Sequence, residues 1–275
     1  MSESPETPEP SDSVDEISNI EVRCYFVRER NVLLTRAEFS DLFTDHYIHL
    51  MENKIRHSAE NDQLLKDALA AMTLHLASRP RNETTAWTMN FTDPPANLFA
   101  VGSSKSGNVV ARLSTEDVKV GDHNMFYAQV AREDEGTRQS TVGFGGHDVF
   151  SAVESYYQQS EQRPAAYFHV DVEDVVMITA QPDCDLEWFL NLDDEQVKKI
   201  DQEESLSLLE TRSYHYGCGC SLDRIYPIIA AMSAGSVDEV FAGQETANAS
   251  CPRCGARYRM TREGLEAHIS EQEDV

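Results

Sequence analysis

The sequence Tyr216-Gly217-Cys218-Gly219-Cys220-Ser221 contains two cysteines separated by one residue, and Cys251-Pro252-Arg253-Cys254-Gly255 contains a second close pair. Thirty residues lie between the two pairs. Zinc prefers four soft ligands in a tetrahedron, and two close cysteine pairs on two loops supply that geometry. Glycines beside the cysteines let the backbone turn sharply around a metal. The pattern therefore predicts one Zn²⁺ bound by Cys218, Cys220, Cys251 and Cys254.

Other uses of these thiols remain open. The same four cysteines could hold an iron–sulfur cluster or stay free of metal. His215 and His268 are alternative ligands near the two pairs. We expect both to be ordinary surface histidines, because four thiolates already complete a tetrahedral shell. A small C-terminal module with few large apolar side chains needs a metal to fold, which favours a bound ion.

The spacing of the first pair indicates redox chemistry, because a Cys-x-Cys pair is uncommon in purely structural zinc ribbons. Zinc keeps cysteines as thiolates, the form that oxidants attack. An oxidised cysteine can be resolved by its neighbour into a local disulfide, and the metal is then lost. Since zinc supplies about 10–16 kcal/mol of folding free energy in small modules, oxidation would unfold this one. The alternative is a zinc ribbon whose purely structural zinc mediates protein or nucleic-acid interaction.

The charge of the chain argues against polyanionic partners. The 275 residues include 48 acidic and 23 basic ones, which gives a formal net charge of −25. Such a field repels nucleic acid and anionic lipid. Arg253 lies within the second cysteine pair and three more arginines follow it, yet residues 217–270 hold five basic and six acidic side chains. This balance leaves no strong basic footprint, so we expect neither nucleic acid nor a membrane as a partner.

Several sequence features are missing, and their absence leads to expectations about the location of the protein and about catalysis. There is no run of about 18 apolar residues, and the acidic first residues differ from a secretory signal. We therefore expect a cytoplasmic protein whose thiols stay reduced. We find no phosphate loop, dinucleotide fingerprint or catalytic constellation, and the Cys251–Cys254 pair lacks the βαβ context of a disulfide oxidoreductase. The sequence predicts no catalytic residues and no enzyme.

Hydrophobic periodicity predicts an α+β domain of mixed sheet and helices over residues 21–182. A strand is expected at residues 22–27, and Thr35-Arg36-Ala37-Glu38 has the pattern of a capping box that begins a helix. A second helix is expected over residues 60–78, ended by Pro80. A third helix is expected over 148–162. Alternating apolar residues and turn chemistry predict strands near 87–91, 98–101, 109–113, 125–130, 141–144, 165–170 and 175–179.

Three further segments complete the domain organisation. Residues 1–20 contain no Lys or Arg and are expected to form a disordered acidic tail. Residues 171–204 hold 12 acidic and two basic residues among scattered apolar ones. This predicts a metastable helical linker over 183–212, docked on the first domain. Residues 213–275 form the C-terminal zinc-binding module, with helices expected over 222–232 and after the capping box Ser236-Val237-Asp238-Glu239, and a strand at 258–260.

Two separate motifs resemble those of the 33 kDa chaperonin family of redox-regulated heat-shock holdases. The first is the Cys-x-Cys-Ser sequence, the long gap, and Cys-x-x-Cys-Gly with Tyr258 three residues later. The second is Tyr156-Tyr157-Gln158-Gln159-Ser160-Glu161-Gln162-Arg163-Pro164, which is similar to the family's Tyr-Phe-x-x-Ser-Glu-Gln-x-Pro segment. The resemblance spans residues 22–265 with the domains in the same order.

The resemblance implies an ATP-independent chaperone that binds unfolding client proteins and protects them from aggregation under oxidative stress. In the family, zinc holds the C-terminal module folded and the reduced protein inactive. Oxidation would release zinc, form the disulfides Cys218–Cys220 and Cys251–Cys254, unfold the module and the linker, and accompany formation of a homodimer.

This chain departs from the family in several features. Its linker is short for the family. The family usually has a basic, acidic, basic run after Cys-x-Cys-Ser, whereas here Leu222 and Asp223 precede Arg224. Two cysteines are additional. We expect Cys24 to be a small buried hydrophobe or an idle thiol. Cys184 lies in the linker, where a minor redox role is the alternative to an idle thiol.

Overall fold

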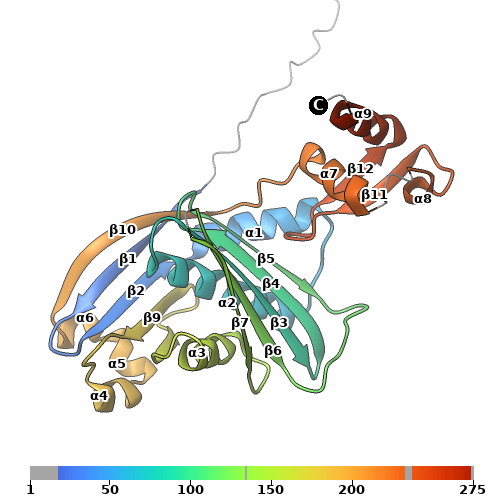
Figure 1. The fold of residues 1–275 in the computed structure, drawn as a ribbon. Helices are drawn as coiled ribbons and strands as arrows, with labels where there is room; N and C mark the ends of the chain where they lie inside the picture. Colours follow the sequence, from blue (N-terminus) through green and yellow to red (C-terminus); the bar gives the residue numbers. More distant parts are fainter. Residues whose placement is uncertain (1–17, 134, 233–236, 274–275) are drawn as a thin grey trace, which may run out of the picture.

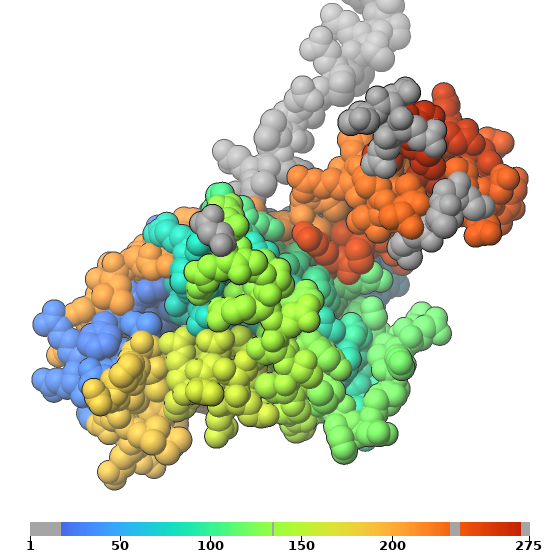
Figure 2. Space-filling view, viewed as in Figure 1, coloured from blue at the N-terminus to red at the C-terminus, as the bar shows by residue number. Residues whose placement is uncertain are grey.

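The computed structural model describes residues 18–133, 135–232 and 237–273. Most of the expected acidic tail lies outside these residues, and so does Ser236, the expected cap of a C-terminal helix. Figure 1 shows a large curved sheet with helices against it and a small C-terminal lobe at one end. In Figure 2 this lobe, coloured orange to red, adjoins the body of the molecule. The chain therefore has a mixed α+β fold.

Ten strands form one mixed sheet in the order β7-β6-β3-β4-β5-β10-β1-β2-β9-β8. All neighbouring strands are antiparallel except β5 and β10, which are parallel. The strands are β1 (Ile20–Val27), β2 (Val32–Glu38), β3 (Glu83–Thr92), β4 (Pro95–Ser103), β5 (Asn108–Ser114), β6 (Met125–Arg132), β7 (Gly136–Gly143), β8 (Ala165–His169), β9 (Asp174–Ala180) and β10 (Leu206–Tyr216). The strands expected in the first domain are confirmed as β1 and β3 to β9.

The helix α2 (Ala59–Ala77) lies at the centre of the main core. Nearly every residue from Leu64 to Ala77 is buried, as expected for a helix covered on all sides. It contacts strands of both halves of the sheet and the helix α3 (Val149–Gln159). Both helices lie close to the residues expected from periodicity, so the two predictions are confirmed.

The motif that begins at Tyr156 belongs to this core. Tyr156 and Tyr157 are both buried. The Tyr156 hydroxyl donates a hydrogen bond of 2.9 Å to Glu161, and Arg79 forms a 2.8 Å ion pair with the same carboxylate. The Tyr157 hydroxyl lies 2.6 Å from His75 Nδ1. The motif therefore holds α3 against α2 through buried polar contacts.

Three short helices occupy most of the segment expected to be a linker. They are α4 (Leu186–Leu190), α5 (Asp194–Lys198) and α6 (Ile200–Glu203). Phe189, Val197 and Ile200 are buried in a second core cluster with residues of β1, β2 and β9. Arg30, in the turn between β1 and β2, pairs with Asp185 at 2.7 Å and with Glu204 at 3.0 Å. The helices are therefore docked on the sheet.

Two expectations about this part of the chain need correction. Residues Thr35 to Glu38 do not begin a helix, because they belong to β2 and pair with β9. Long-range pairing in the sheet outweighs the local capping pattern, and α1 (Ser40–Glu52) begins after Phe39 without a side-chain cap. The helical part of the linker also ends at Glu203, and β10 follows it. The boundary expected at residues 212/213 falls inside β10, which pairs with β1 along its length.

The C-terminal lobe has its own small core. It consists of α7 (Leu222–Met232), α8 (Val237–Phe241), β11 (Thr246–Ser250), β12 (Arg257–Thr261) and α9 (Arg262–Glu273). Ile225, Phe241, Met260 and Leu265 are its buried residues. The helix expected at 222–232 and the strand at 258–260 are confirmed, while β11 and α9 were not anticipated. Among the described residues, no helix has both the length and the apolar character needed to cross a membrane.

Candidate metal centre

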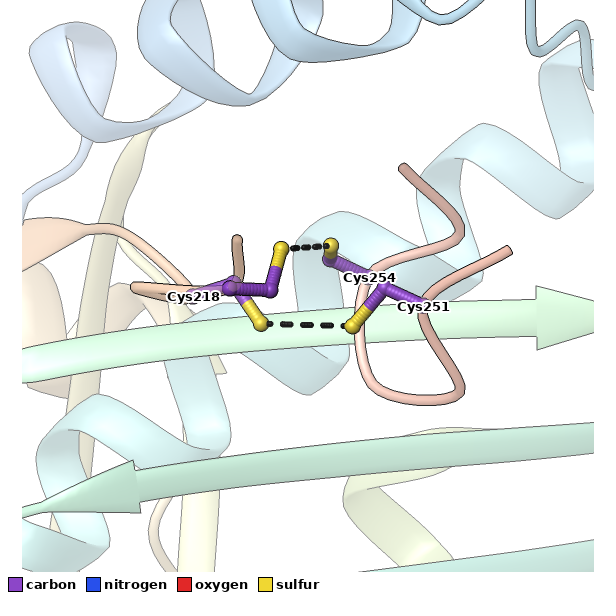
Figure 3. Close-up of side chains that lie close together, drawn as sticks. Cys218, Cys251 and Cys254 are labelled. Atoms are coloured by element: carbon purple, nitrogen blue, oxygen red, sulfur yellow. Dashed lines mark hydrogen bonds between the residues drawn. The ribbon is translucent and has the colours of Figure 1, made fainter. Parts of the chain in front are cut away.

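The four cysteines of the two pairs lie together where the C-terminal lobe meets the large sheet. Cys218 and Cys220 follow the end of β10, and Cys251 and Cys254 lie in the turn between β11 and β12. The Sγ atoms of Cys218 and Cys251 are 3.7 Å apart, and those of Cys220 and Cys254 are 3.5 Å apart (Figure 3). All four sulfurs lie within 4.8 Å of one another. The fold therefore forms one cluster of four thiols.

The cluster fits a tetrahedral zinc ion. Zinc–sulfur bonds of about 2.3 Å place the sulfurs of a regular tetrahedron roughly 3.8 Å apart. The separations of 3.5 and 3.7 Å lie close to this value. Cys251 and Cys254 are 3% and 2% exposed, whereas Cys218 and Cys220 are partly exposed. The arrangement can thus bind a metal and leaves one side open to small reagents.

Local backbone geometry brings the second pair together. Gly255 has φ of +78°, and its N–H donates a 2.9 Å hydrogen bond to the carbonyl of Cys251. The N–H of Cys251 in turn donates to the Ala256 carbonyl at 2.8 Å. The Ala256 N–H donates a hydrogen bond to Cys254 Sγ, with the two atoms 3.4 Å apart. A donor in this position stabilises the thiolate form of Cys254. Glycine is required here because the left-handed conformation costs other residues about 1–2 kcal/mol.

Tyr258 contacts the first pair from β12. Its hydroxyl lies 3.0 Å from Cys220 Sγ and 3.0 Å from the Cys220 carbonyl oxygen. The register of β12 against β11 fixes this position, because Tyr258 pairs with Ala249 just before the second cysteine pair. The phenol can therefore donate a hydrogen bond to a sulfur that is negative when it ligates a metal.

Hydrogen bonds among the four thiols give them different pKa values. The hydrogen bond with Cys254 lowers the pKa of Cys218 to about 5, and the nearby Arg253 acts in the same direction. The same hydrogen bond raises the pKa of Cys254, and burial adds to this. Burial also raises the pKa of Cys220. The first proton is therefore lost readily, while further thiolates at this spacing need a cation to balance their charge.

Residues of the first domain bind the backbone of the second cysteine pair. His49 Nε2, on α1, lies 3.0 Å from the Cys254 carbonyl oxygen, and Arg112 on β5 donates a 3.0 Å hydrogen bond to the Cys251 carbonyl. Asn53, at the end of α1, accepts a 2.8 Å hydrogen bond from the Arg257 N–H. The cysteine cluster is therefore part of the contact between the lobe and the first domain.

Tyr216 links the sheet to this contact. It is the last residue of β10, is buried, and lies against the rings of His46 and His49 with centroid distances of 5.2 and 5.4 Å. Burial, with the nearby cysteines adding to it, raises the pKa of its hydroxyl. Two residues later the chain reaches Cys218, so the end of the central strand is fixed to both α1 and the cluster.

The remaining candidate residues lie outside the cluster. The group of possible metal ligands within the described residues contains the four cysteines and neither His215 nor His268. The ring of His268 stacks on Tyr226 at a centroid distance of 6.2 Å. Cys24 is 6% exposed, donates to the Ala77 carbonyl, and has a pKa raised to about 11 by burial. The expectation that Cys24 is buried is confirmed, and Cys184 packs against the second core cluster.

The roles of His49, Asn53 and Arg112 were not predicted. His49 and Arg112 contact the backbone of the second cysteine pair, and Asn53 contacts that of Arg257, each from more than 130 residues away in the chain. A single histidine, asparagine or arginine on an amphipathic element has no pattern that distinguishes it from a surface residue. Only the packing of the lobe on the first domain identifies these contacts.

Comparisons with known proteins agree with this arrangement. The family model described as "Hsp33 protein" matches residues 171–261. A 33 kDa chaperonin from Proteus mirabilis is 24% identical over 262 residues, covering 81% of this chain and 88% of that protein. One from Pectobacterium atrosepticum is 23% identical over 146 residues, which cover 44% of this chain and half of the relative's length.

The fold also matches a solved structure. The crystal structure of the 33 kDa chaperonin from Thermotoga maritima superimposes with a TM-score of 0.70, at 12% sequence identity, over 93% of this chain and 99% of that one. These relatives are named as 33 kDa chaperonins. The matched segment contains the four-cysteine cluster. The chain is therefore similar to the Hsp33, or 33 kDa chaperonin, family over residues 171–261, and it shares the fold of a 33 kDa chaperonin.

Proposed function

We propose that this protein is a redox-regulated, ATP-independent holdase that captures unfolding proteins under oxidative stress. The observation that carries the proposal is the position of the four sulfurs, which lie both within ligand distance of one metal and at the contact between lobe and first domain. Chemistry at these sulfurs can then change how the lobe is held. Similarity to proteins named as chaperonins supports the client class, unfolded proteins.

In the reduced state Cys218, Cys220, Cys251 and Cys254 would hold one Zn²⁺. The metal would supply the positive charge that four thiolates at this spacing require, and with it folding free energy for the lobe. Among the described residues, the lobe's own core cluster has four buried hydrophobic residues, which is small for a unit of its size. We infer that without the metal the lobe does not remain folded.

Oxidation of each pair of cysteines by a peroxide would take two steps. A thiolate sulfur attacks one peroxide oxygen and becomes a sulfenic acid, while the O–O bond breaks and the other oxygen leaves as hydroxide, which takes up a proton to form water. A second cysteine attacks the sulfenic sulfur, water leaves, and a disulfide forms. Two peroxides thus convert four thiols into two disulfides. Family resemblance favours the pairs Cys218–Cys220 and Cys251–Cys254, although the sulfurs are mutually close enough for cross-pairs as well.

Loss of the lobe's fold would expose surface for clients. The contacts of His49 and Arg112 with the second cysteine turn would be lost, and the buried face of Tyr216 would be uncovered. On the same helix as His49, three neighbouring side chains are already exposed: Tyr47, Ile48 and Met51. Helices α4 to α6, the metastable part of the linker, would follow and release Phe189, Val197 and Ile200. Together these form an apolar surface for unfolded chains.

The compartment, the domain limits and the oligomeric state are inferred from the resemblance to the family and from thiol chemistry. A reducing compartment such as the cytoplasm keeps the cluster metallated until an oxidant arrives. Domain limits of 21–182, 183–212 and 213–275 are retained as functional units, with β10 shared between the last two. A homodimer would form on activation, when apolar surface becomes exposed.

The test is suppression of client aggregation, measured by light scattering from a heat-denatured enzyme. Peroxide-treated protein should suppress aggregation and the reduced, zinc-loaded protein should not. Cys218→Ser should be active without oxidant, because three ligands hold zinc poorly, whereas Cys184→Ser, outside the cluster, should respond as the wild type. Equal suppression by the reduced and oxidised wild type would eliminate the switch, and a structural zinc site would then be the better description.

A further inference from the structure

A groove of about 410 Å³ lies between the C-terminal lobe and the first domain, next to the cysteine cluster. One wall comes from the loop between α1 and α2 and from β5, and the other comes from the lobe at Ser250, Gly255 and Arg257. A second hollow of about 540 Å³ shares Lys54, Ser250 and Arg257 with the groove. The two hollows therefore form one elongated space along the contact between the two units.

Four cationic side chains line the groove, in a protein of formal net charge −25: Lys54, Arg56, Arg112 and Arg257. Within the described part of the chain, none of them forms an ion pair with a carboxylate. In contrast, Arg30, Arg36 and Arg79 are each paired with an acidic side chain. The groove therefore concentrates positive charge that its protein neighbours do not neutralise.

Two carboxylates and a histidine also line the groove. Glu116 and Asp117 follow the end of β5 and are exposed. Burial lowers the pKa of His57, so its imidazole is neutral near pH 7. Four cations against two carboxylates leave the lining with a formal charge of +2. The sign of the groove is thus opposite to that of the whole protein, which indicates an anionic ligand.

The chemistry of the lining favours a chain of phosphates. Guanidinium and ammonium groups donate strong, charge-assisted hydrogen bonds to phosphate oxygens. The cations stand on both walls, with Lys54 and Arg56 on the first domain and Arg257 on the lobe, so an anion that contacts both walls needs several charges along its length. A nucleotide base would need a ring to stack on. Among the described residues that line the two hollows, none is Phe, Tyr or Trp.

We propose that this groove binds an inorganic oligophosphate, at least as long as tripolyphosphate, which bridges the first domain and the C-terminal lobe. Lys54 and Arg56 bind the anion from one wall and Arg257 binds it from the other. Because the complete site exists only while the two walls are in contact, the bound anion stabilises that contact. A delay in the release of the lobe on oxidation follows if the proposed redox function holds, but the binding itself does not depend on that function.

Calorimetric titration of the full-length reduced protein with tripolyphosphate tests the site. At 0.15 M salt the screening length is about 8 Å, so distant carboxylates repel the ligand little while contacts inside the groove persist. One saturable site is expected, with orthophosphate at least about tenfold weaker because a single phosphate cannot contact both walls. Metal content is measured in the same samples, because phosphate chains also chelate zinc.

Three results would overturn the ligand class. The absence of saturable binding, or equal affinity for orthophosphate and tripolyphosphate, would show that no phosphate chain is recognised. Tighter binding of ATP than of tripolyphosphate would assign the groove to a nucleotide. Tighter binding of a short glutamate peptide would assign it to an acidic polypeptide.

Two double variants with the same change in charge locate the site. Arg56→Gln/Arg257→Gln removes one cation from each wall and should weaken tripolyphosphate binding about tenfold, which corresponds to about 1.4 kcal/mol. Both substitutions spare Arg112, which holds the second cysteine turn. Arg23→Gln/Arg138→Gln, at exposed positions on β1 and β7, should leave binding unchanged. Equal affinities for the two double variants would show that the anion binds elsewhere.

Hydrogen exchange tests whether the anion bridges the two units. The Arg257 N–H donates to Asn53 across the contact, so its exchange reports separation of the lobe from the first domain. Tripolyphosphate at ten times its dissociation constant should slow this exchange about tenfold in the wild type. The same concentration should slow it only about twofold in Arg56→Gln/Arg257→Gln, observed at the residue 257 amide. Binding without any slowing in the wild type would show that the anion contacts one wall only and would refute the bridge.

Discussion

Replacement of Tyr258 by phenylalanine removes one hydroxyl that contacts the cysteine cluster. The phenol oxygen lies 3.0 Å from Cys220 Sγ and equally far from the Cys220 carbonyl. Its proton is therefore shared between two acceptors, of which the thiolate is the charged one. The ring itself is retained, so the packing of β12 and of the lobe's core is preserved.

The magnitude follows from the kind of contact that is lost. A hydrogen bond to a charged group contributes about 1.5–3 kcal/mol, and loss of an outer hydrogen bond at a metal site costs about 10–100-fold in metal affinity. The hydroxyl is partly exposed, so water can replace it in part. We expect the dissociation constant of zinc to rise about tenfold in Tyr258→Phe, which corresponds to about 1.4 kcal/mol.

Competition with a chromophoric zinc chelator under reducing conditions measures this change. Tyr226→Phe is the matched control, because Tyr226 lies in the same lobe but against His268 and not against the cysteines. Peroxide should also oxidise Tyr258→Phe faster, since the Cys220 thiolate loses a donor that holds its charge. An affinity within twofold of the wild type, with the control unchanged, would refute the role assigned to this hydroxyl.

Three further predictions concern other parts of the chain. Burial raises the pKa of Glu154 to about 7. Between the unfolded pKa of about 4.5 and this value, the folded protein keeps the carboxyl protonated while the unfolded chain loses the proton. The free energy of unfolding should therefore fall by up to about 3 kcal/mol as the pH rises from 4.5 to 8. Glu154→Gln keeps the acceptor for the Tyr167 N–H and should flatten this dependence in urea titrations; an unchanged slope would contradict the assignment. Gly255→Ala should lower the melting temperature of the reduced protein by more than Gly136→Ala does. Both glycines have φ near +78°, but only at Gly255 would a Cβ lie 3.1 Å from the Ile55 side chain. Equal shifts in melting temperature would show that this contact is unimportant. Hydrogen exchange should be slow in β10 before peroxide treatment and fast afterwards near Tyr216, and protection that persists there would show that the cluster does not control the strand.

The cysteine cluster and the local elements were predictable because their signals are local. Two close cysteine pairs indicate a metal site wherever they occur, and the apolar spacing of residues 60–78 is that of a buried helix. The strand β10 could not be predicted, since its partner strands are far away in the chain. It pairs with β1 at Cys24–Glu210, about 190 residues apart, and with β5 at Asn108–His215, about 105 residues apart. Only two of its eleven residues are buried and four are exposed, so it lacks a clear alternation.

The capping pattern at Thr35 failed for the same reason. Its residues satisfy a local rule, but seven pairings with β9 decide the conformation. The contacts of His49 and Arg112 with the second cysteine pair, and of Asn53 with Arg257, depend on how two folded units meet. Such contacts carry no signal in a single sequence, and they are the ones that connect the metal centre to the rest of the molecule.

The most direct test measures zinc and free thiols together in the same sample, before and after peroxide. The reduced protein should contain one zinc per chain. After treatment that zinc should be free and four thiols should be lost, those of Cys218, Cys220, Cys251 and Cys254, while Cys24 stays reduced because it is buried with a pKa of about 11. A reduced protein without zinc, or one that retains zinc after its thiols are oxidised, would contradict the central claim that these four sulfurs form the switch.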